Sequence, residues 1–141
     1  MSAARRELEV AATLDQLQHV TAFVVNAGRE TTRLTDHQLY HCELSVDEIF
    51  SNIIEHGFKH QGASHTVRIS CQALSDRFEI IIRDDAPAFD PFKQQAPAKA
   101  FSLDDGSVGG WGLRFVMTCM DSVEYRHEDG ENWIILGKKY T

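Results

Sequence analysis

Three groups of polar side chains in this sequence have the types and spacing needed to bind and activate a charged ligand. In the segment DEIFSNIIEHG, Glu48, Asn52 and His56 recur at intervals of four residues. Side chains four residues apart lie on one face of a helix. The Asn52 amide oxygen suits a hard cation such as Mg²⁺, and Glu48, one turn before it, could act as a general base. A solvated polar helix face is the alternative at this point.

The second group is a carboxylate at the end of a predicted strand. Asp84 continues the apolar alternation of RFEIIIR, residues 77–83. A carboxylate in an apolar row is costly to bury unless it is hydrogen-bonded. Asp84 is therefore a candidate acceptor for an amino group of a ligand in an apolar pocket. The alternative is that it caps a turn ahead of Pro87.

The third group is the glycine-rich segment GSVGGWGL at residues 106–113. Glycines let a backbone approach a ligand closely, and a helix N-terminus binds phosphate through its free N–H groups. The segment is not a Walker loop, because no Lys-Ser or Lys-Thr follows. It is not a dinucleotide fingerprint either, because a loop and not a strand precedes it. A flexible turn is the alternative.

The elements that must position these groups follow from the period of the apolar residues. Alternation predicts strands at 6–12, 65–73, 77–83, 122–127 and 131–139, the last two joined at Asp129-Gly130. Residues 85–108 are predicted to be a loop, long enough to be functional or mobile. Hairpins and one-sided strands predict an α/β two-layer sandwich, with helices on one face of a mixed, mainly antiparallel sheet.

Three helices are predicted between and after these strands. Capping boxes of Thr13 with Gln16 and of Thr35 with Gln38 open the first two. Gly57 is the natural end of the second helix, which carries Glu48 and Asn52. The third follows the glycine-rich segment.

Composition limits the class of protein. The 141 residues predict a single domain, 1–141. A net charge of −7 without a Lys/Arg cluster argues against a direct nucleic-acid partner. The absence of a long apolar run and of a signal peptide favours a cytoplasmic protein without a membrane segment. The three widely spaced cysteines are interpreted as free, core-filling thiols.

Taken together, the three groups resemble the motifs of the Bergerat-fold (GHKL) ATPases, in the same order along the chain. The similarity is closest to small anti-sigma factors that are also serine/threonine kinases. Their motifs read E-x-x-x-N-x-x-x-H-G, D-x-G-x-x-F-D-P and G-G-x-G-L, with a later Met-Asp. The matching segments here begin at Glu48, Asp84 and Gly109, and the helix ends at Met120-Asp121. The resemblance spans nearly the whole chain.

This resemblance implies a histidine-kinase-like ATPase domain that uses ATP and Mg²⁺. Asn52 would hold Mg²⁺, Glu48 would deprotonate the substrate serine or threonine, and Asp84 would bind the adenine amino group. A lid at 93–108 would cover the phosphates. The remaining nucleotide-binding positions that it implies are His56, Ala86, Phe89, Gly109, Gly110, Trp111, Gly112 and Leu113. The implied partners are a STAS-type anti-sigma factor antagonist, which is phosphorylated, and a sigma factor, which is sequestered. Such proteins are often homodimers.

Two departures from the family pattern keep a second function open. Ala86 replaces a glycine, which costs on the order of 1 kcal/mol if that backbone position needs a positive φ. No lysine or arginine lies between Lys99 and Arg114, so the part of the lid next to the glycines has no cation for the γ-phosphate. The alternative function is a partner-switching binding module with weak or no kinase activity.

Several other polar and aromatic side chains are better explained by structural roles than by catalysis or binding. His56 and His60 have the spacing of a zinc pair, but Gly57 interrupts the helix and no third ligand is obvious. Trp111 is interpreted as a lid hinge, ahead of adenine stacking or a core position. Asp85 and Asp90 are interpreted as turn-formers, and Asn132 as a hairpin-edge residue rather than an adenine contact through water.

Overall fold

In the part of the chain that the structure describes, a five-stranded antiparallel sheet carries three α-helices on one side. The computed structural model describes residues 5–93 and 108–141, and for residues 108–111 the backbone alone. The strands are β1 (Arg6–Ala11), β2 (Thr66–Ala73), β3 (Arg77–Asp84), β4 (Ser122–Glu128) and β5 (Glu131–Lys139). The helices are α1 (Leu17–Glu30), α2 (Asp36–Asn52) and α3 (Val108–Cys119). All predicted strands are confirmed to within one or two residues.

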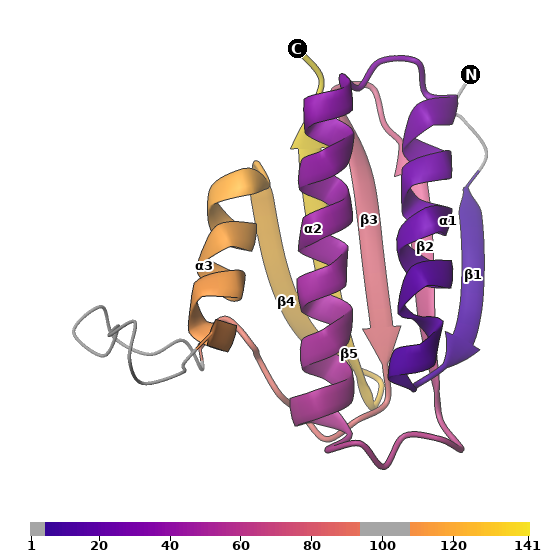
Figure 1. Cartoon of the computed structure of the whole chain (residues 1–141), viewed down its shortest axis with the longest axis vertical. Coiled ribbons are helices and arrows are strands. Elements are labelled where there is room, and N and C mark those ends of the chain that lie inside the picture. The colour runs from indigo at the N-terminus through magenta and orange to yellow at the C-terminus, as the bar shows by residue number, and fades with distance from the viewer. Residues whose placement is uncertain (1–4, 94–107) are drawn as a thin grey trace.

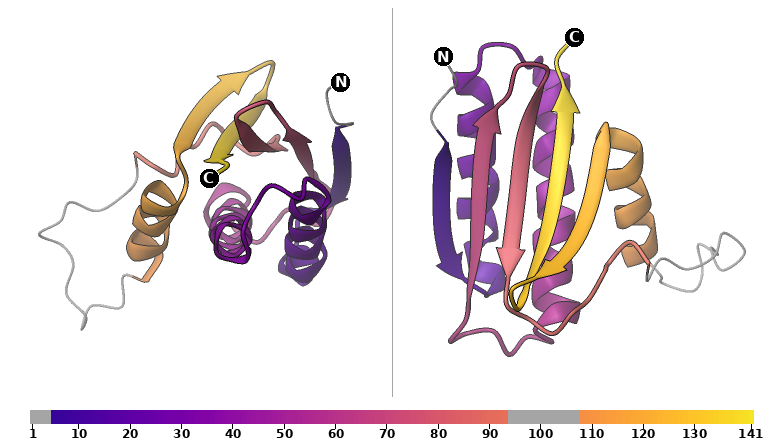
Figure 2. Two further views of the ribbon diagram at one scale, coloured as in Figure 1. Left: turned by 90° about the horizontal axis from the view of Figure 1, so that it is seen from above. Right: turned by 180° about the vertical axis from the view of Figure 1, so that it is seen from behind.

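The sheet and the helices form two layers. The strand order is β1-β2-β3-β5-β4, and every neighbouring pair of the described strands is antiparallel. Helices α1 and α2 lie side by side against one face, with α3 next to α2 near the β4 edge (Figure 1). None of the described helices covers the opposite face (Figure 2). The predicted two-layer sandwich is confirmed, while the parallel pairing that a mixed sheet would contain is absent from the described strands.

The core lies between the two layers and follows from the two periodicities. Alternate strand residues point toward the helices and are buried, whereas their neighbours face the open side. The fully buried side chains of the core include Val20, Val24, Val46, Ile49, Phe50, Ile69, Phe78, Ile80, Ile82, Ile134 and Leu136. Each buried large apolar side chain contributes about 1.5 to 3 kcal/mol to the free energy of unfolding. The sheet and α2 are thus held rigidly against each other.

The two predicted capping boxes have different outcomes. At α2 the Thr35 hydroxyl accepts a hydrogen bond from the Gln38 N–H (3.1 Å), and the Gln38 side chain accepts one from the Thr35 N–H (2.9 Å). That prediction is confirmed. The prediction of a capping box at Thr13 is wrong, because the Thr13 hydroxyl donates instead to the carboxylate of Asp15, two residues later. A 3-10 turn follows Thr13, and α1 begins at Leu17.

Helix α2 ends in a widened turn. Residues Ile53–Gly57 are π-helical, and the Phe58 N–H donates to the Ile53 carbonyl (2.9 Å). The predicted end at Gly57 is confirmed, but the left-handed residues are Lys59 and His60, with φ of 52° and 61°. π-helical turns inside helices often occur at functional sites. Here the turn follows Asn52 directly.

The last hairpin fixes which residues of β5 face β3. Its turn has positive φ at Asp129 (54°) and Gly130 (77°), as expected for the two-residue turn that suits the twist of antiparallel strands. The register that results places Asn132 directly opposite Asp84. None of the described helices has the length and apolar character needed to cross a bilayer.

The three cysteines are free and buried, as predicted. Burial raises the pKa of the Cys42 thiol to about 12. These thiols are part of the buried core.

Candidate functional site

A cleft lies where β3 and β5 meet the end of α2. The empty space between its walls is about 250 Å³ when the adjoining open solvent is included. Its lining residues come from α2 and its widened turn, from the two strand ends and from the segment after β3: Asn52, Ile53, Gly57, Asp84, Phe89, Pro91, Asn132 and Ile134. The cleft brings together two groups that lie 32 positions apart in the sequence, Asn52 and Asp84.

Asp84 is the acid among the described residues that line the cleft, and 3% of its surface is exposed. Its Oδ1 accepts hydrogen bonds from the Ala86 N–H (2.9 Å) and from the Asn132 amide (3.0 Å). Burial raises the pKa of Asp84, the two hydrogen bonds oppose this rise, and the nearby Asp85 and Glu131 carboxylates add to it. Within the described residues, no hydrogen bond reaches Oδ2. That oxygen is available to a ligand.

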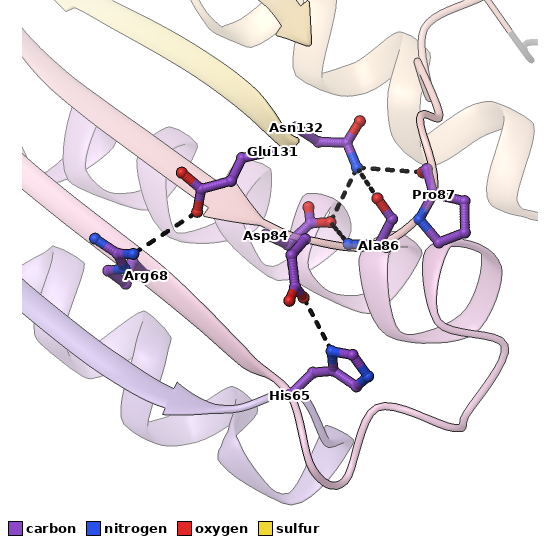
Figure 3. A network of polar contacts seen from close by, with 8 residues as sticks. His65, Arg68, Asp84, Ala86, Pro87, Glu131 and Asn132 are labelled. Carbon is purple, nitrogen blue, oxygen red and sulfur yellow. Dashed lines mark hydrogen bonds and ion pairs between the residues drawn. The ribbon is translucent and has the colours of Figure 1, made fainter. Parts of the chain in front are cut away.

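Asn132 is a central part of the site and not a hairpin-edge residue. It is 2% exposed, and its Nδ2 donates to Asp84 Oδ1 and to the carbonyls of Ala86 (3.0 Å) and Pro87 (3.2 Å). Figure 3 shows the amide nitrogen between these three oxygens. The interpretation as a hairpin edge was wrong. The sequence did indicate the burial of Asn132, because Asn132 alternates with the apolar residues Ile134 and Leu136.

Tyr125 belongs to the same network and was missed by the sequence reasoning. Its hydroxyl donates to Asn132 Oδ1 (2.5 Å), and the Phe89 N–H donates to both of these oxygens (3.2 Å each). The tyrosine lies on β4, whose neighbour is β5. Only the register between these strands brings its hydroxyl to Asn132, so no local motif could have indicated it.

Ala86 fits its position without backbone strain. It is 3% exposed, and it is not among the residues with positive φ. Its methyl group faces Gly57, where an added Cβ would lie 3.4 Å away. The condition under which Ala86 would cost free energy is therefore not met in this conformation. The methyl group instead fills space beside the end of α2.

Glu48 and Asn52 are joined as their spacing predicted. The Asn52 Nδ2 donates to the Glu48 carboxylate (3.0 Å) and to its carbonyl oxygen (3.2 Å). This arrangement leaves the Asn52 Oδ1 as the amide atom available to a cation. Burial raises the pKa of Glu48, Asp47 and Glu55 raise it further, and the Asn52 hydrogen bond opposes the rise. A raised pKa improves a carboxylate as a general base near neutral pH.

Helix α3 lies directly against Glu48. A Cβ added at Gly112 would overlap the Glu48 carboxylate, so only glycine permits this contact. The glycine-rich segment was predicted to precede the helix, and this was wrong: α3 begins at Val108 and includes Gly112 and the buried Leu113. Nothing in a glycine backbone prevents the α conformation. No side-chain contact is described for Gly109, Gly110 and Trp111, and their roles stay predictions.

His56 and Phe89 occupy the rim of the cleft. Phe89 lines it, whereas His56 is exposed and stacks on the Phe89 ring, with centroids 6.4 Å apart. The described residues hold no cluster of three His, Cys, Asp or Glu side chains that could bind a metal, and the His56–His60 pair gains no third ligand there. Apart from Lys93 and Val108, the predicted lid at 93–108 lies outside the described residues.

Comparison with known proteins identifies relatives of both sequence and fold. The model of the histidine kinase-like ATPase domain family matches residues 10–138. Serine/threonine-protein kinase BtrW of Bordetella bronchiseptica is 36% identical over 93 residues, which cover 66% of this chain and 65% of that protein. Serine-protein kinase RsbW of Bacillus pumilus is 32% identical over 94 residues, covering 62% of this chain and 57% of that protein. The chain thus spans less than two thirds of either relative.

Solved structures share the fold. The RsbU and RsbW domains of a Mycobacterium tuberculosis protein superpose with a TM-score of 0.64 at 13% identity, covering 98% of this chain and 33% of that one. The catalytic domain of the histidine kinase ThkA superposes with a TM-score of 0.54 at 12% identity, covering 96% and 98%. At such identities the likeness shows the fold alone, and it confirms the predicted sandwich.

Proposed function

The chain belongs to the histidine kinase-like ATPase domain family, and from this membership we propose that it is an ATP-dependent protein serine/threonine kinase of the anti-sigma type. The observation that carries the proposal is the buried Asp84 in one cleft with Asn52. A buried carboxylate with one free oxygen suits an exocyclic amino group, as adenine has. The relatives named as serine kinases supply the reaction class.

The residues of the cleft suit ATP with Mg²⁺. Asp84 Oδ2 would accept a hydrogen bond from the adenine amino group, with Ile53 and Ile134 as apolar walls beside the base. Asn52 would hold Mg²⁺ through Oδ1, because its Nδ2 is occupied by Glu48. Mg²⁺ usually takes one or two protein oxygens and completes its shell with water and phosphate. Bound there, the ion would neutralise charge on the phosphates.

Glu48 would be the general base of the transfer. The substrate hydroxyl would lose its proton to the Glu48 carboxylate as its oxygen attacks the γ-phosphorus. The bond between the γ-phosphorus and the bridging oxygen then breaks, and ADP leaves. Gly112 lies against the Glu48 side chain, which stays partly exposed.

The proposed substrate is a STAS-type anti-sigma factor antagonist, and the proposed second partner is a sigma factor. We place this activity in the cytoplasm, with the protein acting as a homodimer. The missing cation between Lys99 and Arg114 favours a second candidate, a binding module that exchanges these partners without efficient phosphotransfer. Ala86 no longer supports that alternative, because its backbone is unstrained in this conformation.

Phosphotransfer to a STAS protein separates the two functions. The protein is incubated with radiolabelled ATP, Mg²⁺ and a candidate STAS protein, and the label on the STAS protein is measured over time. We expect transfer to fall about 10²- to 10⁴-fold in Glu48→Gln. Glu43→Gln, on the same helix, should keep the full rate. A sigma or STAS complex that forms without nucleotide, together with no transfer by the wild type, would establish the binding module instead.

A further inference from the structure

Asn132 and Tyr125 form a relay that ends at the proposed adenine-binding carboxylate. The relay runs across three adjacent strands, from Tyr125 on β4 through Asn132 on β5 to Asp84 on β3. The sequence motifs that suggested an ATP site include neither Tyr125 nor the amide of Asn132. Their placement deepens the proposed function, and the inference below rests on nucleotide binding in this cleft.

The neighbours of Asn132 permit one orientation of its amide. Its Nδ2 faces three acceptors: the Asp84 carboxylate and the carbonyls of Ala86 and Pro87. Its Oδ1 faces two donors, the Tyr125 hydroxyl and the Phe89 N–H. A flipped amide would set its oxygen against three acceptors and its nitrogen against the Phe89 N–H, which can only donate. Among the described residues, Tyr125 supplies the one side-chain donor to Asn132 Oδ1, since the other donor is the backbone N–H of Phe89.

The consequence of this orientation is that Asp84 presents a single acceptor to the cleft. Oδ1 is saturated by the amides of Ala86 and Asn132, which leaves Oδ2. Because the Asn132 amide is itself fully engaged, it can neither donate to nor accept from a ligand directly. The polar end of the cleft therefore offers an acceptor without a donor. A base that places an amino group against Asp84 Oδ2 gains a hydrogen bond. A base that places a carbonyl oxygen there sets two acceptors against each other and binds more weakly.

We infer that Tyr125 and Asn132 are positioning residues that set the preference of this cleft for a 6-aminopurine over a 6-oxopurine nucleotide. Without the Tyr125 hydroxyl, Asn132 Oδ1 keeps only the Phe89 N–H as a donor, and the amide is held less firmly against Asp84. The direction of the Asp84 carboxylate is then less sharply fixed, and the cleft distinguishes the two bases less well. The fold is retained, because the Tyr125 ring packs against the core and only the hydroxyl takes part in the relay.

The test compares ATP with inosine triphosphate, in which a carbonyl oxygen replaces the 6-amino group. Both affinities are measured by calorimetry with Mg²⁺ for the wild type, Tyr125→Phe and Tyr140→Phe. Tyr140 is a matched control: it is also half-buried, and its hydroxyl donates to the Leu74 carbonyl (3.1 Å), outside the cleft. We expect the ratio of ATP to inosine triphosphate affinity to fall roughly 3- to 10-fold in Tyr125→Phe and to stay constant in Tyr140→Phe.

A double-mutant cycle tests that Tyr125 acts through Asn132. In an Asn132→Leu background, Tyr125→Phe should change the affinity ratio no further. An unchanged ratio in Tyr125→Phe, or an equal loss for both nucleotides, overturns the relay while nucleotide binding stands. A wild type that binds neither nucleotide overturns the proposed function and the relay together. Thermal melting of each variant checks that the comparison is made on folded protein.

Discussion

Replacing Ala86 with glycine should weaken the protein without improving its ATP site. The family motif has glycine at this position, so the resemblance alone predicts that Ala86→Gly restores affinity. The structure predicts the opposite. Ala86 has no positive φ, so glycine relieves no strain. Ala86 is only 3% exposed, and loss of its methyl group costs about 0.8 kcal/mol. The greater freedom of glycine in the unfolded chain adds about 0.5 to 1 kcal/mol.

The expected result is a loss of about 1.5 kcal/mol in the free energy of unfolding, measured with urea, and an ATP affinity within about twofold of the wild type. Ala63→Gly, at an exposed turn, serves as the matched control, because it changes the backbone freedom without removing a buried methyl group. A variant that is more stable than the wild type, or that binds ATP several-fold more tightly, would refute this reasoning. Such a result would mean that the nucleotide-bound backbone needs the left-handed conformation.

Three further predictions concern Gly112, Glu48 and the cap of α2. Gly112→Ala should lower the rate of phosphotransfer strongly and change the urea midpoint little, because the new methyl group displaces the Glu48 carboxylate from Asn52. If Gly112→Ala lowers the rate further when it is added to Glu48→Ala, the loss has a cause other than Glu48. The free energy of unfolding should depend on pH through Glu48, whose pKa is higher in the folded than in the unfolded chain. The stability that Glu48 contributes is fully present below its unfolded pKa and is lost as pH rises through its folded pKa. Glu48→Gln should therefore flatten this part of the plot of unfolding free energy against pH. Thr35→Ala should lower the free energy of unfolding by about 1 kcal/mol by removing the α2 cap, whereas Thr13→Ala, which caps no helix, should cost clearly less.

Local pattern was enough to predict the strands and the two layers, whereas the meeting of Asn52 with Asp84 was implied by the family resemblance. Alternation is a property of neighbouring residues, and the row that ends in Asp84 points its carboxylate toward the helices for the same reason as Ile80 and Ile82. The Thr35 box was predictable because both of its hydrogen bonds are local. Thr13 has equal potential, but Asp15 competes for its hydroxyl.

The parts that escaped prediction depend on tertiary register. Tyr125 reaches Asn132 only because β4 pairs with β5, and Asn132 reaches Asp84 only because β5 pairs with β3. The orientation of the Asn132 amide is then set by its hydrogen-bond partners on β3, on the segment after β3 and on β4. The unstrained backbone of Ala86 likewise depends on the turn that these contacts hold in place. No spacing rule along a single segment contains this information.

The most direct test of the central claim, that Asp84 lies in an ATP site, is calorimetric titration with ATP and Mg²⁺. Wild type, Asp84→Asn and Asp76→Asn are compared; Asp76 is exposed in the β2–β3 turn and pairs with Arg77. Our account predicts that the wild type and Asp76→Asn bind ATP alike and that Asp84→Asn binds about 10- to 100-fold more weakly, because a charge-assisted hydrogen bond is lost. Equal binding by the wild type and Asp84→Asn, or no binding by the wild type, would contradict it.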